Sequence, residues 1–180
     1  MSFVIDDAIT LAESWFEEEL DSAQCLIWAN EFLRRKVSNK LWSESTEDYA
    51  DKSADTWYDL PTDFFMTVKV LDENDVTYEN CRMRNGKIMF ASDGTYELTY
   101  VQYPEALSDT DTTDFPLPDA FLYPLAEFLI FRFYNQELDD EDSKNSAMEY
   151  EGRYLSSLKE IYSRMQINTD TEIFKPRLRW

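Results

Sequence analysis

The stretch DGTYELTYVQYPEAL, residues 93–107, has the clearest strand pattern of a chain in which most other long segments have a helical period. Tyr96, Leu98 and Tyr100 occupy every second position, as expected for a β-strand with one buried face. Pro104 ends the pattern, because proline has no N–H to donate to a sheet. The sequence therefore predicts a β element in the middle of a helical protein.

The residues before this stretch extend the predicted β region to about 57–104. Residues 64–71, FFMTVKVL, are rich in aromatic and β-branched side chains, which favour strands. Asn85 and Gly86 separate two further strand-like segments, and this dipeptide favours the positive φ values of a type I′ hairpin turn. Those two segments are 76–84 and 87–91. We expect the strands to follow one another as an antiparallel meander joined by short turns.

Four segments outside this region place apolar residues three and four positions apart, which is the spacing of one face of an amphipathic helix. These helices are expected at about 3–19, 23–42, 118–136 and 140–165. Asp21 or Ser22 is a suitable N-cap for the second helix. The segment 43–56 is polar and acidic and is interpreted as a loop or linker, and the acidic segment 105–116 is interpreted as a linker.

These elements predict a mainly α fold: a four-helix bundle with an inserted antiparallel β meander and an extended C-terminal tail. Packing two helical hairpins together is the simplest way to bury four one-sided helices, and it leaves the β region as an insertion at one end. We expect residues 1–165 to form a single domain. Residues 166–180 have no helical period and are interrupted by Pro176, so they are expected to form the tail.

The chain carries 37 acidic and 17 basic residues, which gives a formal net charge of −20. Such a chain should be repelled by DNA phosphates and anionic lipids except at local basic patches. The alternative interpretation is that the charge serves only solubility. The sequence lacks a run of about 18 apolar residues, and its acidic N-terminal segment lacks the basic flank of a signal peptide. We therefore expect cytoplasmic synthesis, reduced thiols and no membrane partner.

Few residues in the sequence suit catalysis or metal binding. The chain contains no histidine, which removes histidine-based acid–base catalysis and most transition-metal sites. Cys25 and Cys81 are expected to be core or half-buried residues instead of nucleophiles, because no histidine is present to lower the pKa of a thiol. The acid clusters at 109–114 and 139–142 lack the ligand spacing and glycine of a calcium loop and are interpreted as solvated loops. We predict no catalytic residue, no cofactor and no metal.

Basic residues are scarce, so their two concentrations are candidates for contacts with other molecules. Arg34, Arg35 and Lys36 on the second helix either balance nearby acids or lie at a subunit interface. The C-terminal tail contains no acid after Glu172, and it is either a frayed terminus or a segment that docks in a groove of a partner. Its docking candidates are Phe174, Lys175, Arg177, Leu178, Arg179 and Trp180.

Aromatic side chains are abundant, with 12 Phe, 11 Tyr and 5 Trp. Most of them fall on helix stripes or alternate strand positions, which favours core packing over the stacking of sugars or bases. Tyr96 and Tyr100 in the opening stretch are accordingly interpreted as packing residues or as part of a subunit interface.

Four segments, in their order along the chain, resemble the head-to-tail adaptor (connector) proteins of tailed bacteriophages. LIWANEFLRR at 26–35 is similar to a W-x-N-E helix of that family, and YDLPTDFFMTVKV at 58–70 to its LP-x-D-f segment. GTYELTYVQYPEAL at 94–107 is similar to the Y-x-x-yP-x-l segment that follows. Residues 117–158 carry an lP-x-x-f helix, an acidic gap and an A-x-x-Y-e-x-x-y helix. Together the resemblance covers about residues 5–165.

The resemblance implies a structural virion protein with a helical core, a β insertion and no enzymatic activity. Such a protein is made in the host cytoplasm and assembles in the virion neck as a homo-oligomeric ring, usually of twelve subunits, below the portal. One surface would contact the portal protein and another the tail or a further neck protein. DNA would pass through an electronegative channel during ejection without specific binding.

A different class of protein, an acidic DNA mimic or inhibitor that occupies a DNA-binding partner, also fits a net charge of −20. Two observations disfavour it. The acids gather in predicted linkers and helix ends instead of forming a row with phosphate spacing, and a basic tail is a poor feature for a DNA mimic. An enzyme is the third class considered, and the sequence favours it least.

Overall fold

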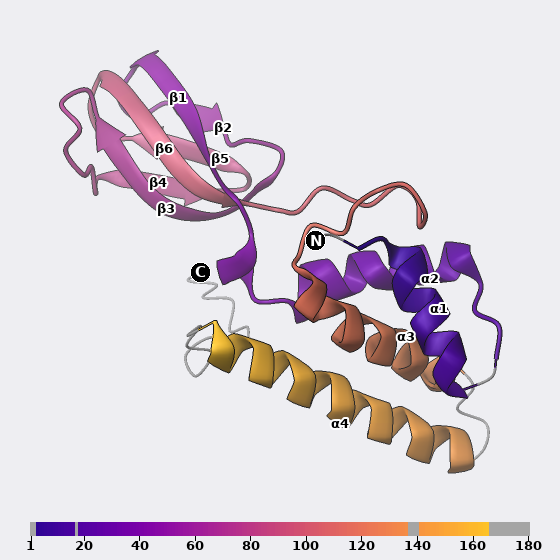
Figure 1. Ribbon diagram of the computed structural model, residues 1–180. Helices are drawn as coiled ribbons and strands as arrows, with labels where there is room; N and C mark the ends of the chain where they lie inside the picture. Colours follow the sequence, from indigo (N-terminus) through magenta and orange to yellow (C-terminus); the bar gives the residue numbers. More distant parts are fainter. Residues whose placement is uncertain (1–2, 17, 137–140, 166–180) are drawn as a thin grey trace. The chain divides into compact units, whose positions relative to one another are not determined.

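A computed structural model describes residues 3–16, 18–136 and 141–165 of the chain. The chain divides into two compact units (Figure 1). The first, the helical unit, contains the residues up to Leu41 and those from Ala106 onward. The second, the β unit, contains Trp42–Glu105. The predicted β region, about 57–104, therefore lies within the β unit, which begins earlier than predicted.

Among the described residues, the helical unit contains four α-helices. They are α1 (Ile5–Phe16), α2 (Ser22–Glu31), α3 (Leu122–Gln136) and α4 (Glu141–Arg164). The Asp21 carboxylate accepts a 2.7 Å hydrogen bond from the Gln24 N–H, which confirms Asp21 as the N-cap of α2. Short turns of other helical types follow α2 and precede α3. They are a π-helical turn at Phe32–Lys36 and 3₁₀ turns at Asn39–Leu41 and Asp119–Phe121.

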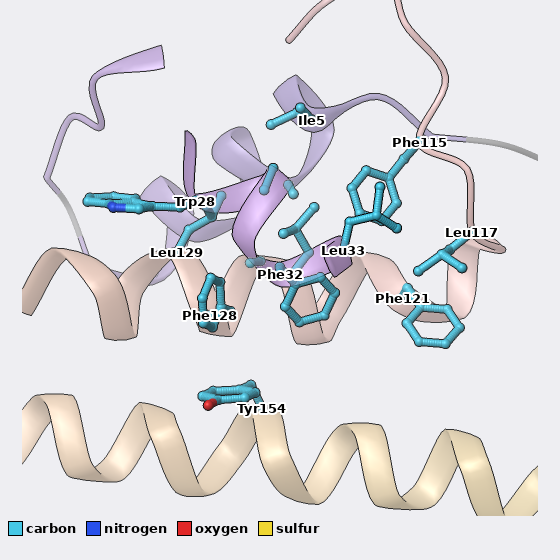
Figure 2. Packing of buried hydrophobic residues seen from close by; sticks show 14 of the residues in the cluster. Ile5, Trp28, Phe32, Leu33, Phe115, Leu117, Phe121, Phe128, Leu129 and Tyr154 are labelled. Atoms are coloured by element: carbon cyan, nitrogen blue, oxygen red, sulfur yellow. The ribbon is translucent and has the colours of Figure 1, made fainter. Parts of the chain in front are cut away.

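Helix α3 is the central element of the helical unit, because α1 and α2 pack on one side of it and α4 on the other (Figure 1). The Phe128 ring shows this arrangement most directly (Figure 2). Its centroid lies 5.3 Å from that of Phe32, in the turn after α2, and 5.3 Å from that of Tyr154 on α4. Phe128 of α3 therefore contacts aromatic rings from the layers on both of its sides.

The prediction of a mainly α four-helix bundle is wrong. The helices form layers on the two sides of α3, and the second half of the architecture is β-structure. The second predicted helix, 23–42, is also shorter than expected. It leaves α-helical geometry at Phe32, and Val37 is already extended, with φ −79° and ψ 139°.

The β unit contains two three-stranded antiparallel sheets (Figure 1). In the first sheet the order is β1–β6–β3, and in the second it is β2–β5–β4. The strands are β1 (Glu44–Lys52), β2 (Trp57–Asp59), β3 (Phe64–Asp72), β4 (Cys81–Arg84), β5 (Lys87–Phe90) and β6 (Gly94–Gln102). The strand predicted within residues 93–107 is thus β6, the middle strand of its sheet.

The apolar faces of the two sheets share one core. Phe90 of β5 stacks on Tyr96 of β6 with centroids 4.0 Å apart and rings 6° from parallel. The other buried members of this cluster are Tyr49, Val70, Ile88, Leu98 and Tyr100. Alternate residues of β6 therefore point into the core, as the alternation in the sequence predicts.

The prediction of a meander of consecutive strands is also wrong. β6 lies between β1 and β3, and β5 lies between β2 and β4, so most neighbours in a sheet are not neighbours in sequence. β1 occupies the segment 43–56 that was predicted to be a loop. Its sequence, ESTEDYADK, has one large buried residue, Tyr49, because β1 is an edge strand with a largely solvated surface.

The predicted Asn-Gly hairpin is confirmed. Asn85 and Gly86 have φ values of 52° and 71°, and Arg84 pairs with Lys87 on either side of them. The two ends of the β unit also meet, since the Gln102 N–H donates a 3.0 Å hydrogen bond to the Ser43 carbonyl oxygen. The chain consequently enters and leaves the β unit at one place.

The acidic segment after the β unit is part of the helical core. Phe115 stacks on Phe3 with centroids 4.9 Å apart, and its N–H donates a 2.7 Å hydrogen bond to the Phe3 carbonyl oxygen. The buried residues of this segment are Leu107, Phe115 and Leu117. These apolar residues interrupt the acids, and they anchor what was predicted as a plain linker.

Replacement of Phe90 by alanine is expected to lower the free energy of unfolding by about 3–5 kcal/mol, because it empties the space against Tyr96. Urea denaturation of the purified protein measures this loss. Val76→Ala is the control, since Val76 is 58% exposed, and it should change the free energy of unfolding by less than about 0.5 kcal/mol. Equal effects of the two substitutions would contradict the shared core.

The contact between α3 and α4 includes a half-buried carboxylate. Glu127 accepts a 2.8 Å hydrogen bond from the Ser157 hydroxyl, and burial raises the pKa of Glu127 above its ordinary value of 4.5, although Ser157 and Arg153 oppose this shift. The folded protein therefore binds this proton more tightly than the unfolded chain. The ionised carboxylate costs stability at neutral pH, and this cost disappears as the pH falls below 4.5.

Glu127→Gln should therefore raise the melting temperature at pH 7, since glutamine keeps an acceptor for Ser157 without a charge to desolvate. The difference from the natural protein should shrink as the pH is lowered to 4. Calorimetry at several pH values measures it. The exposed Glu79→Gln is the control, and a gain that grows toward low pH would contradict the assigned direction.

Candidate functional site

The W-x-N-E segment of α2 holds in place the chain segment that returns from the β unit to the helical unit. The Asn30 carboxamide donates hydrogen bonds from Nδ2 to the carbonyl oxygens of Leu26, at 3.0 Å, and Leu107, at 3.1 Å. Its Oδ1 accepts a 2.9 Å hydrogen bond from the Leu107 N–H. One side chain thus satisfies both backbone groups of Leu107, the last residue of the Y-x-x-yP-x-l segment.

The neighbours of Asn30 bind the same helical unit together. Trp28 and Ala29 are buried in the core. Glu31 forms an ion pair with Arg132 of α3, with Oε2 and Nη2 3.4 Å apart and both side chains mostly buried. Every residue of the motif therefore has an internal structural role.

The two β-unit motifs contact each other. The Tyr100 hydroxyl donates a 3.0 Å hydrogen bond to Asp63 Oδ1, and the Tyr103 N–H donates a 2.7 Å hydrogen bond to the Asp63 carbonyl oxygen. Burial raises the pKa of Tyr100, which keeps its hydroxyl protonated as a donor. The LP-x-D-f segment thus closes on the end of β6.

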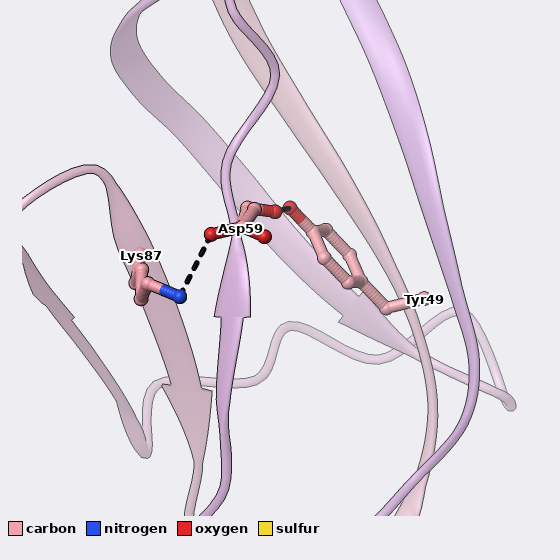
Figure 3. A network of polar contacts seen from close by, with 3 residues as sticks. All are labelled: Tyr49, Asp59 and Lys87. Atoms are coloured by element: carbon pink, nitrogen blue, oxygen red, sulfur yellow. Dashed lines mark hydrogen bonds and ion pairs between the residues drawn. The ribbon is translucent and has the colours of Figure 1, made fainter.

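A further polar network joins strands of both sheets (Figure 3). The Tyr49 hydroxyl of β1 donates a 2.9 Å hydrogen bond to the Asp59 carbonyl oxygen of β2. The Asp59 carboxylate forms a 2.9 Å ion pair with Lys87 of β5. Because Asp59 and Lys87 are solvated, the ion pair adds little stability, and the buried tyrosine makes the firmer contact.

The remaining motif, A-x-x-Y-e-x-x-y on α4, supplies core residues. Ala147 and Tyr154 are buried, and the Tyr154 ring contacts Phe128 and Phe131 of α3. The segments that carry the family resemblance therefore specify internal contacts.

The predicted site residues fall into three groups. The tail candidates, Phe174 to Trp180, lie outside the described residues. Tyr96 and Tyr100 are buried in the β-unit core, where they act as packing residues, and their place in a subunit interface stays a prediction. Arg34, Arg35 and Lys36 form the π-helical turn after α2.

In that turn, Arg35 is exposed, and the Lys36 ammonium lies 5.9 Å from the centroid of the Phe128 ring. Helix α4 reaches the same place. The Tyr162 hydroxyl accepts a 2.9 Å hydrogen bond from the Ser38 N–H and donates to the Lys36 carbonyl oxygen. The basic turn and the C-terminal part of α4 are therefore adjacent.

Two exposed apolar patches in the helical unit were not anticipated from the sequence. Trp15 of α1 and Tyr123 of α3 are 37% and 59% exposed, and their ring centroids are 5.9 Å apart. Met148 and Leu155 of α4 are 72% and 50% exposed. The latter pair lies one position beyond Ala147 and Tyr154 in the sequence, so the core stripe alone should have indicated that both are turned away from it.

Burial accounts for the two thiols, and internal hydrogen bonds account for Asp109 in the acid cluster at 109–114. Burial, reinforced by Asp21 and Glu13, raises the pKa of the buried Cys25 to about 12, and burial also raises that of the half-buried Cys81. Asp109 closes its own turn. Its carboxylate accepts hydrogen bonds from the Thr113 hydroxyl and from the N–H groups of Thr112 and Thr113, and these bonds hold its pKa well below its usual range. Within the described ranges, no helix combines the length and apolar content needed to cross a membrane.

The sequence was compared with models of known protein families. The sequence model of the SU10 adaptor protein family matches residues 4–176. The chain belongs to the SU10 adaptor protein family. The resemblance to bacteriophage head-to-tail adaptors is thereby confirmed at the level of the family. A comparison with curated proteins gave no match.

In this adaptor, Asn30→Ala is expected to lower the free energy of unfolding by about 1–3 kcal/mol, because it leaves the backbone groups of Leu107 without partners. Hydrogen exchange at the Leu107 amide should become faster, which mass spectrometry detects in peptides that cover this residue. Asn145→Ala on the exposed face of α4 is the control. Unchanged exchange at Leu107 would show that other contacts hold the returning chain.

Proposed function

We propose that the protein is a structural head-to-tail adaptor that forms a ring below the portal, joins the capsid to the tail and lines the DNA channel. The observation that carries this proposal is the family match over residues 4–176. In this role residues 1–165 act as one adaptor domain made of both units. The protein acts by binding in the virion neck, without catalysis.

The charge of the chain supports the proposed place beside DNA. With 37 acids and 17 bases, the subunit carries a net charge of −20, and a ring multiplies that charge around its axis. An electronegative wall repels phosphates, so DNA passes during ejection without specific binding.

Attachment to the portal is assigned to the C-terminal segment. Three bases alternate with apolar residues there, and no acid follows Glu172. In a chain so rich in acids, this segment is the most suitable one for an acidic or apolar groove on a portal subunit. Each single contact can be weak, because a ring presents many identical tails at once and gains avidity. The opposite side of the ring is assigned to the tail or a further neck protein.

Removal of residues 172–180 should weaken binding to purified portal rings about tenfold or more, because multivalent attachment amplifies the loss of each contact. Co-sedimentation with portal measures binding, and negative-stain microscopy shows the added ring. Replacement of Lys175, Arg177 and Arg179 by glutamine keeps the length of the tail and separates charge from apolar contacts.

Unchanged portal binding by the truncated protein would overturn the docking role of the tail. Failure of the full chain to bind portal or to occur in purified virions would overturn the adaptor function itself. Tight, salt-sensitive binding to a nuclease or repressor would instead favour the DNA-mimic alternative.

A further inference from the structure

The outer helix α4 carries an apolar strip that the described residues leave uncovered. Met148 and Leu155 lie seven positions apart and therefore share one line along the helix with Tyr162, which is seven positions further. Tyr162 is held against the turn at Lys36 and Ser38, whereas Met148 and Leu155 are at least half exposed. Apolar side chains exposed along one line of a helix mark an interaction surface when they form one patch with their neighbours.

A glycine lies between the two apolar residues. Gly152 is exposed in the middle of α4, where glycine costs about 1 kcal/mol relative to alanine. Among the residues that the structure describes, outside the backbone of α4 around Gly152, a Cβ atom at this position would meet no atom within 4 Å, so the packing of these residues does not require glycine. Its absence of a side chain does permit a partner to approach the helix closely between Met148 and Leu155.

Basic residues border the strip at both ends. Lys144 lies one turn before Met148, and Lys159 lies one turn after Leu155. Within the described part of the chain, neither lysine forms an ion pair. We call Lys144, Met148, Gly152, Leu155 and Lys159 the α4 strip. Its two free lysines, in a chain with a net charge of −20, suit an acidic partner with an apolar centre.

The second exposed patch of the helical unit has that composition. Trp15 and Tyr123 form its aromatic centre, Glu18 and Glu19 follow Trp15 in the sequence, and Asp119 precedes Tyr123 by one helical turn. All three acids are exposed. We call these five residues the aromatic patch.

The two surfaces lie on opposite flanks of the helical unit. Tyr123 and Glu127 are four positions apart on one face of α3, and Glu127 contacts Ser157 of α4. Ser157 is two residues from Leu155, which places it about 200° around the helix from the α4 strip. The aromatic patch therefore faces the Ser157 flank, and the α4 strip faces the opposite one.

We propose that the α4 strip of one copy of this chain receives the aromatic patch of the next copy, and that this contact builds the ring. The inference rests on the proposed adaptor function and names its subunit interface. Complementary surfaces on opposite flanks give a heterologous contact, which repeats from copy to copy and closes when the rotation between copies divides the circle. The basic turn at Arg35 and Lys36 lies at the Tyr162 end of the strip and extends the same interface.

The occupant of the strip can be identified with a photoreactive benzoylphenylalanine in place of Met148, in the full chain bound to portal rings. After irradiation, mass spectrometry of the cross-linked peptides should show residues around Trp15 or Tyr123 of another copy. Peptides from the portal, from residues 166–180 or from residue 148 of another copy would overturn the proposal. The same group in place of Glu149, one position away on the solvent side, is the control and should give at least about tenfold less of this product.

A pair of neighbouring substitutions tests the energetic role of the strip. Leu155→Asp should reduce ring assembly on the portal about tenfold or more, whereas Ser156→Asp introduces the same group on the solvent face and should leave assembly unchanged. Circular dichroism melting checks that both variants remain folded. Equal assembly of the two variants would overturn the proposed interface while the adaptor function stands, and a natural chain that does not bind portal would overturn both.

Discussion

The hydrogen bonds between Asn30 and Leu107 impose the constraint on which the two-unit architecture depends. The chain leaves the helical unit after Leu41 and returns at Ala106, so the central helix α3 can form only if the returning segment is held in register. A carboxamide does this with a donor and an acceptor, as a neighbouring strand would. Burial of Leu107, Phe115 and Leu117 then fixes the path to α3.

Local sequence signals predicted the elements whose structure is determined locally. The cap at Asp21, the Asn85-Gly86 turn and the alternation in β6 all rest on neighbouring residues, and the structure confirms each. The order of the strands does not rest on neighbours, because β6 pairs with β1 across more than forty residues of sequence. A meander was the simplest arrangement of the predicted strands, and long-range pairing replaced it.

The missed strand β1 and the missed surface on α4 have a common physical origin. A strand at a sheet edge needs few apolar residues, and in β1 the buried Tyr49 is sufficient. On α4, the stripe that includes Ala147 and Tyr154 explains how the helix packs, so Met148 and Leu155 add nothing to a prediction of the fold. Their significance emerges only from their exposure. The family motifs likewise specify internal contacts, which is why they identify the protein without locating its binding surfaces.

The meeting of Ser43 and Gln102 at the base of the β unit makes this unit modular. A segment whose ends adjoin can be lengthened, shortened or exchanged without pulling apart the chain on either side of it. Relatives of this adaptor can thus diverge in the β unit while the helical unit keeps its packing. For the experimenter, a reporter domain with similarly close termini could be grafted at residues 42–105 to label the neck of the virion.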